Sequence, residues 1–323
     1  MDRRMLVRGG ALACLWLPRS ARAQQAGKVP VVGILNSGPP DARSLGILRH
    51  GLSELGYAEG QTIMLEVRAT SGHPERLPSF AADLVQRKVD VLFAIGPAAL
   101  KASADATRTI PIVAFDLETD PVQSGLARSL SRPGGNVTGL FLDLPGLTGK
   151  WLELIREAAP KTRRVAVLWD STTGGWQLAA VKAAAGGIGW EVQVVEVRSS
   201  TDLDKALAGA RRPRDPLVQL SSPTFEAHAR QIAEFAVRYR LPAIALSARF
   251  TEAGGLMSYG PPRPEFGQRL AVFVDKILKG ASAADIPIEL PERFELVINL
   301  GAARAIGLAL PRSLIDRADR TLP

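Results

Sequence analysis

Ile110-Pro111-Ile112-Val113-Ala114-Phe115 recurs 131 residues further along the chain as Leu241-Pro242-Ala243-Ile244-Ala245-Leu246. In each copy a proline precedes a short apolar run, which is typical of a strand buried on both faces of a parallel sheet. Gly56-Tyr57 recurs at nearly the same spacing as Gly189-Trp190. A near-constant offset across separate elements predicts that the chain is built from two similar halves.

The first half alternates short apolar runs with amphipathic segments. Leucines at 45, 48, 52 and 55 have helical spacing, and Gly56 follows them as a helix stop. We predict strands at 31–35, 63–67, 89–95 and 112–115, and helices at 44–55, 80–85 and 98–106. Repeated strand–helix units predict a parallel sheet covered by helices on both faces.

The second half repeats this order. We predict strands at 165–168, 192–197 and 217–220, and helices at 177–188 and 232–239. A strand at 137–141 marks the joint, and a helix at 266–278 and a strand at 296–299 exceed what the repeat needs. The expected fold is α/β, with two similar Rossmann-like lobes, each a parallel sheet, joined by multiple hinge strands. Lobe 1 is predicted at 28–141 plus about 261–288, and lobe 2 at about 142–260 plus 289–323.

The first 23 residues have the features of an export signal. Arg3, Arg4 and Arg8 precede an apolar stretch at 9–17, and Ala21-Arg22-Ala23 fits a small-x-small cleavage site. That stretch is too short to span a bilayer, so we expect a periplasmic protein. The alternative is a cytosolic protein with a basic N-terminus. Cys14 is the only cysteine, and cleavage after residue 23 would leave no thiol for catalysis, disulfides or metal binding.

The formal net charge of +8 does not indicate nucleic-acid binding. Five arginines and one aspartate lie within residues 1–23, and without that segment the net charge is about +4. The remaining basic residues are scattered and form no stripe interleaved with aromatic residues. We therefore expect no nucleic-acid partner.

Several catalytic and cofactor motifs are missing from the sequence. His50, His73 and His228 are not at metal-ligand spacing. No Gly-x-Ser-x-Gly elbow, phosphate-binding loop or Gly-x-Gly-x-x-Gly fingerprint is present. We expect no catalytic residue, no metal and no cofactor.

Ligands of doubly wound sheets bind beyond the carboxyl ends of the strands, so the loops that follow the strands supply the candidate site. Pro97 and Pro223 begin helices there, which leaves first-turn N–H groups available for a carboxylate. Phe250 and Tyr259 are candidates for stacking on a ring. The alternative is that the loop residues serve only as turns and caps. The predicted ligand-binding residues are Asn36, Ser37, Gly96, Pro97, Ala98, Asp116, Thr119, Asp120, Asp170, Ser171, Ser221, Ser222, Phe250 and Tyr259.

Asp116, Glu118 and Asp120 form an acidic cluster after the fourth strand. Such a cluster can hold a ligand amine or cap the following turn. It can also serve acid–base catalysis or bind a metal, which leaves an enzyme of similar fold as an alternative.

Several segments carry a family resemblance. They include Asp120-Pro121-Val122, Arg132-Pro133-Gly134-Gly135-Asn136-Val137-Thr138-Gly139, Gly254-Gly255-Leu256-Met257-Ser258-Tyr259-Gly260, Lys276-Ile277-Leu278-Lys279-Gly280 and Phe294-Glu295-Leu296-Val297-Ile298-Asn299-Leu300. Together they resemble the ABC transporter substrate-binding proteins of the TrpX type, which have the type I periplasmic-binding fold. The resemblance extends over about residues 29 to 318 in the same order.

This resemblance implies an exported component of an ABC uptake system that delivers a small organic ligand to a membrane permease. An amino acid, an aromatic acid or a related carboxylate is expected, and we expect a monomer. Thr119-Asp120-Pro121 and Ser258-Tyr259-Gly260 match the family pattern, whereas Asn36-Ser37-Gly38 and Asp170-Ser171-Thr172 depart from its aromatic amino-acid binders. Amino-acid specificity therefore stays open. A sensory partner that presents its ligand to a membrane receptor is a further alternative.

Overall fold

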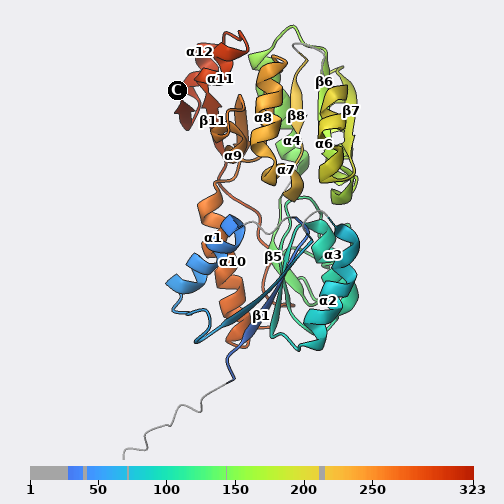
Figure 1. Ribbon diagram of the computed structural model, residues 1–323, viewed down its shortest axis with the longest axis vertical. Helices are drawn as coiled ribbons and strands as arrows, with labels where there is room; N and C mark the ends of the chain where they lie inside the picture. The colour runs from blue at the N-terminus through green and yellow to red at the C-terminus, as the bar shows by residue number, and fades with distance from the viewer. Residues whose placement is uncertain (1–27, 39–41, 71–72, 143, 211–214) are drawn as a thin grey trace, which may run out of the picture.

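The computed structural model describes residues 28–38, 42–70, 73–142, 144–210 and 215–323. The predicted export signal at 1–23, including Cys14, lies outside these residues. The described chain forms two bodies stacked along the long axis of the molecule (Figure 1). None of its helices combines the length and the apolar character needed to cross a membrane.

Lobe 1 is built on a five-stranded sheet of order β2-β1-β3-β4-β5, in which every neighbouring pair is parallel. The predicted strands are confirmed, with shifts of one or two residues at their ends. The elements are β1 (Val31–Asn36), α1 (Ala42–Glu54), β2 (Met64–Ala69), η1 (Pro74–Arg76), α2 (Leu77–Gln86), β3 (Val91–Ile95), α3 (Pro97–Ala106), β4 (Ile112–Phe115) and β5 (Val137–Leu140).

Lobe 2 is built on a seven-stranded sheet of order β12-β11-β10-β9-β8-β6-β7. Its first part contains α4 (Leu144–Ala158), β6 (Arg164–Asp170), η2 (Ser171–Thr173), α5 (Trp176–Gly187), β7 (Glu191–Val197), η3 (Ser200–Asp202), α6 (Leu203–Gly209) and β8 (Leu217–Gln219). It continues with α7 (Pro223–Ala227), α8 (Ala229–Arg238), β9 (Ala243–Ala245), α9 (Ala248–Glu252) and β10 (Met257–Gly260). The chain ends with α10 (Arg263–Leu278), β11 (Glu295–Asn299), α11 (Leu300–Ala305), α12 (Arg312–Asp316) and β12 (Arg320–Leu322).

One strand pair departs from the parallel pattern, because β11 runs antiparallel to β10. Between these two strands the chain leaves lobe 2, forms α10 against lobe 1 and returns (Figure 1). β11 therefore enters its sheet from the side at which β10 leaves it, which reverses its direction.

α10 belongs to lobe 1 by its contacts. It packs against α1, and its residues Phe266, Leu270 and Phe273 share a core cluster with Val32 and Phe93 of the five-stranded sheet. The Tyr57 hydroxyl, in the turn after α1, donates a 3.0 Å hydrogen bond to Asp275 Oδ1. The chain therefore passes between the two sheets three times: after β5, after β10 and before β11.

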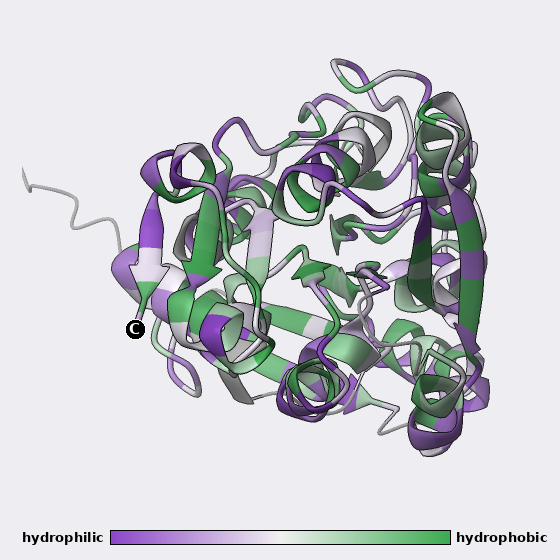
Figure 2. Cartoon of the chain, turned by 90° about the horizontal axis from the view of Figure 1, so that it is seen from above, coloured by the Kyte–Doolittle hydropathy of each residue, from purple (hydrophilic) through white to green (hydrophobic). Residues whose placement is uncertain are grey.

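Each sheet is covered by apolar packing on both faces. Two core clusters flank the five-stranded sheet and two flank the seven-stranded sheet. Figure 2 shows the hydrophobic residues gathered on the strands and on the inner sides of the helices. Trp151 of α4 is fully buried, and its indole N–H donates a 2.8 Å hydrogen bond to the carbonyl oxygen of Tyr259 in β10. This packing makes each lobe a rigid platform for the loops at its strand ends.

Candidate functional site

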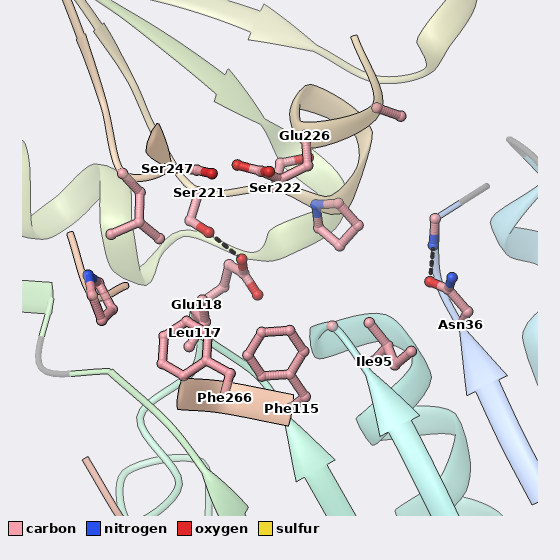
Figure 3. Close-up of a pocket in the computed structure, with 16 residues that line it drawn as sticks. Asn36, Ile95, Phe115, Leu117, Glu118, Ser221, Ser222, Glu226, Ser247 and Phe266 are labelled. Atoms are coloured by element: carbon pink, nitrogen blue, oxygen red, sulfur yellow. Dashed lines mark hydrogen bonds between the residues drawn. The ribbon is translucent and has the colours of Figure 1, made fainter. Parts of the chain in front are cut away.

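The carboxyl ends of the strands of the two lobes face each other and enclose a cavity (Figure 3). The space between its walls is about 730 Å³, part of which is open to solvent. Its lining consists of Asn36, Gly38, Ile95, Gly96, Phe115, Leu117, Glu118, Ser221, Ser222, Pro223, Glu226, Ala227, Leu246, Ser247, Pro261 and Phe266.

The lobe 1 side of the cavity is mainly apolar. Ile95 and Phe115 end the neighbouring strands β3 and β4, and Phe266 reaches the same place from α10 (Figure 3). The rings of Phe115 and Phe266 are tilted by 54° with centroids 5.4 Å apart. This geometry is favourable for an aromatic pair and leaves an apolar surface toward the cavity.

The lobe 2 side presents short polar side chains. Ser222 precedes Pro223 at the start of α7, and its Oγ accepts hydrogen bonds from the backbone N–H groups of Thr224 and Phe225 at 3.0 and 3.3 Å. The same hydroxyl donates to Asp170 Oδ2 at 2.6 Å. Ser222 is therefore fixed both as a helix cap and as the partner of a buried carboxylate.

Ser221 is held in position by its backbone. Its N–H donates to Gln177 Oε1 at 2.7 Å, and its carbonyl accepts from Gln177 Nε2 at 2.8 Å. Gln177 is fully buried in α5. This paired amide contact leaves the Ser221 side chain directed across the cavity.

Ser221 and Glu118 connect the two lobes. The Ser221 hydroxyl donates a short hydrogen bond to Glu118 Oε1, so that a lobe 2 loop contacts the segment that follows β4 of lobe 1 (Figure 3). Glu118 is 4% exposed and Asp116 is fully buried. Asp116 Oδ1 accepts from the backbone N–H groups of Glu118 and Thr119 at 2.9 and 3.1 Å, which shapes the turn that carries Glu118.

Burial raises the pKa of Glu118 well above its usual range, and the negative charge of Asp116 raises it further. Burial also raises the pKa of Asp116. Both effects favour the neutral carboxylic acid. The hydrogen bond that the Ser221 hydroxyl donates lowers the pKa of Glu118 and so opposes part of this rise.

We expect the empty protein to lose stability as the pH rises. A carboxyl whose folded pKa is raised contributes most below its unfolded pKa, about 4.3 for glutamate, and that contribution is lost as the pH rises through the folded pKa. Urea unfolding between about pH 5 and pH 8 measures the dependence. Glu118→Gln keeps a hydrogen-bond acceptor for Ser221 and should make the free energy of unfolding depend less on pH. An unchanged pH profile in this variant would assign the effect to other groups.

Four predicted residues line the cavity: Asn36, Gly96, Ser221 and Ser222. Three others, Pro97, Ala98 and Thr119, line a second hollow in which α3 approaches η2 of lobe 2. The first-turn N–H groups of α3, predicted to hold a carboxylate, therefore adjoin this outer hollow.

The remaining predicted residues have partners or packing within their own lobe. Ser37 Oγ donates to the Ile95 carbonyl at 2.9 Å, and Ser171 Oγ donates to the Val197 carbonyl at 3.3 Å. Asp120 Oδ1 accepts backbone N–H groups of the turn that follows it, and Asp170 Oδ1 accepts the Thr172 N–H at 3.0 Å.

The two predicted aromatic residues lie outside the cavity lining. Phe250 is 1% exposed within the core of lobe 2, and Tyr259 stacks on Phe294 with ring centroids 5.8 Å apart. A role for either in ligand binding stays a prediction.

Sequence reasoning did not single out the apolar lining. Phe115 and Leu246 are the last residues of the repeated hexapeptides, so the repeat itself carried a signal for both. Phe266 had no such signal, because its position depends on the return of α10 to lobe 1. Glu226 and Ser247 also line the cavity and follow the strand ends of lobe 2.

Two mostly parallel sheets joined by three crossings define the type I periplasmic-binding fold. A family model for ABC transporter substrate binding protein matches residues 28–322. The chain belongs to this family of ABC transporter substrate-binding proteins.

Individual relatives support the assignment. The chain is 26% identical to a tyrosine-binding protein of Clostridioides difficile strain R20291 over 268 residues, 80% of this chain and 74% of that protein. It resembles the crystal structure of an ABC domain from Streptococcus pneumoniae in complex with L-Trp, with 23% identity and a TM-score of 0.81 over 91% of this chain and 100% of that one. The structure of a ligand-free, open substrate-binding protein of Clostridium difficile has 23% identity and a TM-score of 0.61, over 91% of this chain and 99% of that one.

Proposed function

We propose that this protein is the exported substrate-binding component of an ABC uptake system and that it closes its two lobes on an amino acid. The observation that carries the proposal is the cavity between the facing strand ends, bridged by the hydrogen bond between Ser221 and Glu118. Residues 1–23 serve as the export signal, the protein acts as a periplasmic monomer, and a membrane permease receives the ligand.

The charge of the lining supports a ligand with an amine. Among the described residues that line the cavity, Glu118 and Glu226 are acidic and none is lysine or arginine. A protonated amine opposite Glu118 would compensate the cost of ionising a buried carboxyl. The apolar surface of Phe115 and Phe266 suits an apolar side chain.

The arrangement of the lobes supports a mechanism of closure. Identity and coverage are nearly equal for the L-Trp complex and for the ligand-free, open protein, but the TM-score is higher for the complex. The structure thus fits a closed arrangement better than an open one. We propose hinges near residues 141, 260 and 288, where the chain passes between the lobes. Selective closure by ligand shifts the population that a permease can recognise.

A ligand screen tests this function. Thermal unfolding of the purified protein is measured with each of the common amino acids and with small aromatic and aliphatic carboxylates. A ligand at a hundredfold excess over its Kd should add about 2.7 kcal/mol of stability. Mass spectrometry of the extract from denatured protein should recover the same molecule. The proposal would be contradicted if no amino acid shifts the thermal unfolding and the extract contains no molecule with an amine.

The same screen separates binding from catalysis. A binding protein returns its ligand chemically unchanged after prolonged incubation, and mass spectrometry detects any product. Turnover would instead support an enzyme that uses Asp116 or Asp120. Loss of ligand uptake by cells that lack this protein would identify a transport component. Unchanged uptake would instead favour a sensory partner.

A further inference from the structure

The carboxyl groups of Asp116 and Glu118 lie buried beside each other at the lobe 1 side of the cavity. Asp116 follows β4 directly and is fully buried, whereas Glu118 is part of the cavity lining. The two carboxyls are in contact, since each forms a side-chain hydrogen bond that changes the pKa of the other. Two ionised carboxylates offer only acceptors, so a hydrogen bond between them needs a proton.

The partners of the two carboxyls account for one oxygen of each. Asp116 Oδ1 accepts backbone N–H groups of its own turn, and Glu118 Oε1 accepts the Ser221 hydroxyl. Asp116 Oδ2 is buried and accepts no hydrogen bond from a donor group of the described residues. The other oxygen of Glu118 is directed into the cavity (Figure 3). A proton held between the carboxyls supplies the hydrogen that the buried oxygen needs.

The described part of the cavity lining holds no positive charge that could offset a second ionised carboxyl, and its other charged residue, Glu226, is also acidic. The charged and titratable residues that surrounding elements carry outside this lining include Lys101 of α3, Asp120, Asp170 of β6, His228 after α7, Arg249 of α9 and Arg269 of α10. Asp116 is the charged residue that acts most on the pKa of Glu118. Both carboxyls lie on the same segment of lobe 1, so their repulsion persists when the lobes separate.

We propose that the Asp116–Glu118 pair holds one proton in the empty protein and that the ammonium group of the bound amino acid takes the place of this proton. The inference rests on the proposed function and adds a proton exchange to it. The displaced proton goes to solvent, and the ammonium keeps its own. The pair gains one negative charge and the ligand brings one positive charge, so the cavity keeps its net charge. Asp116 lies outside the cavity lining and is a positioning residue that acts through Glu118.

This exchange makes the affinity depend on pH in one direction. Below the pKa of the pair in the empty protein, a proton competes with the ammonium group. The Kd should therefore fall by up to about tenfold per pH unit as the pH rises toward that pKa, and it should level off above it. An analogue without the amine cannot replace the proton and should not show this dependence.

Titration calorimetry in phosphate and in imidazole buffer at about pH 6 counts the released protons, because the two buffers differ in their heat of ionisation. The probes are L-phenylalanine, or the common amino acid with the largest thermal shift, and its amine-free carboxylate analogue, which for phenylalanine is 3-phenylpropanoate. The amino acid should release up to about one proton per bound molecule and should bind at least about tenfold more tightly at pH 7 than at pH 5. Binding with no proton release and the same Kd at both pH values would overturn the proposal.

A matched pair of variants tests the role of Asp116. Asp116→Asn keeps an oxygen for the N–H groups of Glu118 and Thr119 but removes the charge, so the ratio of the Kd at pH 5 to that at pH 7 should shrink by at least about threefold. Glu191→Gln removes an exposed carboxyl at the first residue of β7 and should keep the ratio of the unmodified protein. Circular dichroism checks that both variants fold.

An unchanged ratio in Asp116→Asn would refute the coupling of the two carboxyls. If this variant fails to fold, the proton count of the unmodified protein still decides the proposal. The two proposals fail in different ways. If no amino acid binds, the proposed function fails and the exchange fails with it. If amino acids bind without releasing a proton, the function stands and only the exchange is refuted.

Discussion

Replacing Gly139 with alanine is expected to destabilise lobe 1 by at least about 3 kcal/mol. Gly139 lies in β5 and has a backbone φ of +138°. Residues other than glycine rarely adopt this conformation. A Cβ atom there would overlap the carbonyl oxygen of Ala114 and lie 2.6 Å from its amide nitrogen. Strain and steric overlap therefore act together at one position.

The overlap cannot be relieved by a side-chain rotation, because the opposing atoms belong to the backbone. Ala114 is paired with Gly139 in the β4–β5 ladder, and both residues are buried. Moving β5 outward would also break the Glu289 N–H bond to the Gly139 carbonyl, 3.0 Å long, which fixes the third crossing between the lobes.

Urea unfolding measures the loss. Gly149→Ala is the matched control, because Gly149 is exposed within α4 and an added Cβ atom meets nothing within 4 Å. This control should gain about 0.5–1 kcal/mol. Equal stability of the two variants would show that β5 moves freely at Gly139.

Replacing Gly38 with valine is expected to weaken ligand binding by at least about tenfold, or about 1.4 kcal/mol, without unfolding either lobe. Gly38 follows β1 of lobe 1, and a Cβ atom there would lie 2.9 Å from Cβ of Pro223 in lobe 2. The branched side chain therefore obstructs closure, while the cores of both lobes stay untouched. A protein held partly open binds with the affinity of its small closed fraction.

Graded substitution separates obstruction from local damage. Gly38→Ala adds one carbon and should weaken binding less than Gly38→Val, and the ligand-free protein should unfold at the same urea concentration in all three forms. Calorimetry measures the affinity, and small-angle scattering with saturating ligand measures compaction. Full compaction and unchanged affinity in Gly38→Val would mean that the lobes close without this contact.

The sequence allowed the two sheets and the strand-end position of the site to be predicted, because both follow from a repeated pattern. The hexapeptides that end at Phe115 and Leu246 become β4 and β9, and both of these residues line the cavity. Gly96 and Ser222, each before a helix-starting proline, also line it.

Side-chain direction could not be predicted in the same way. Asp170 and Ser222 are close in space but far apart in the chain, so their hydrogen bond and the burial of Asp170 depend on how β6 and β8 pair. Phe250 points into the core of lobe 2 because α9 packs on β9, a contact that no local pattern specifies. Phe266 enters the site only through the non-repeating return of α10.

The return of α10 also sets the order in which the polypeptide can mature during synthesis. One face of the five-stranded sheet is completed by Phe266, Leu270 and Phe273, which are translated long after the strands they cover. A nascent chain that ends before α10 leaves that face only partly covered, by α1, so the N-terminal half cannot reach its native state on the ribosome by itself. Maturation of both halves is thereby postponed until nearly the whole chain has been made.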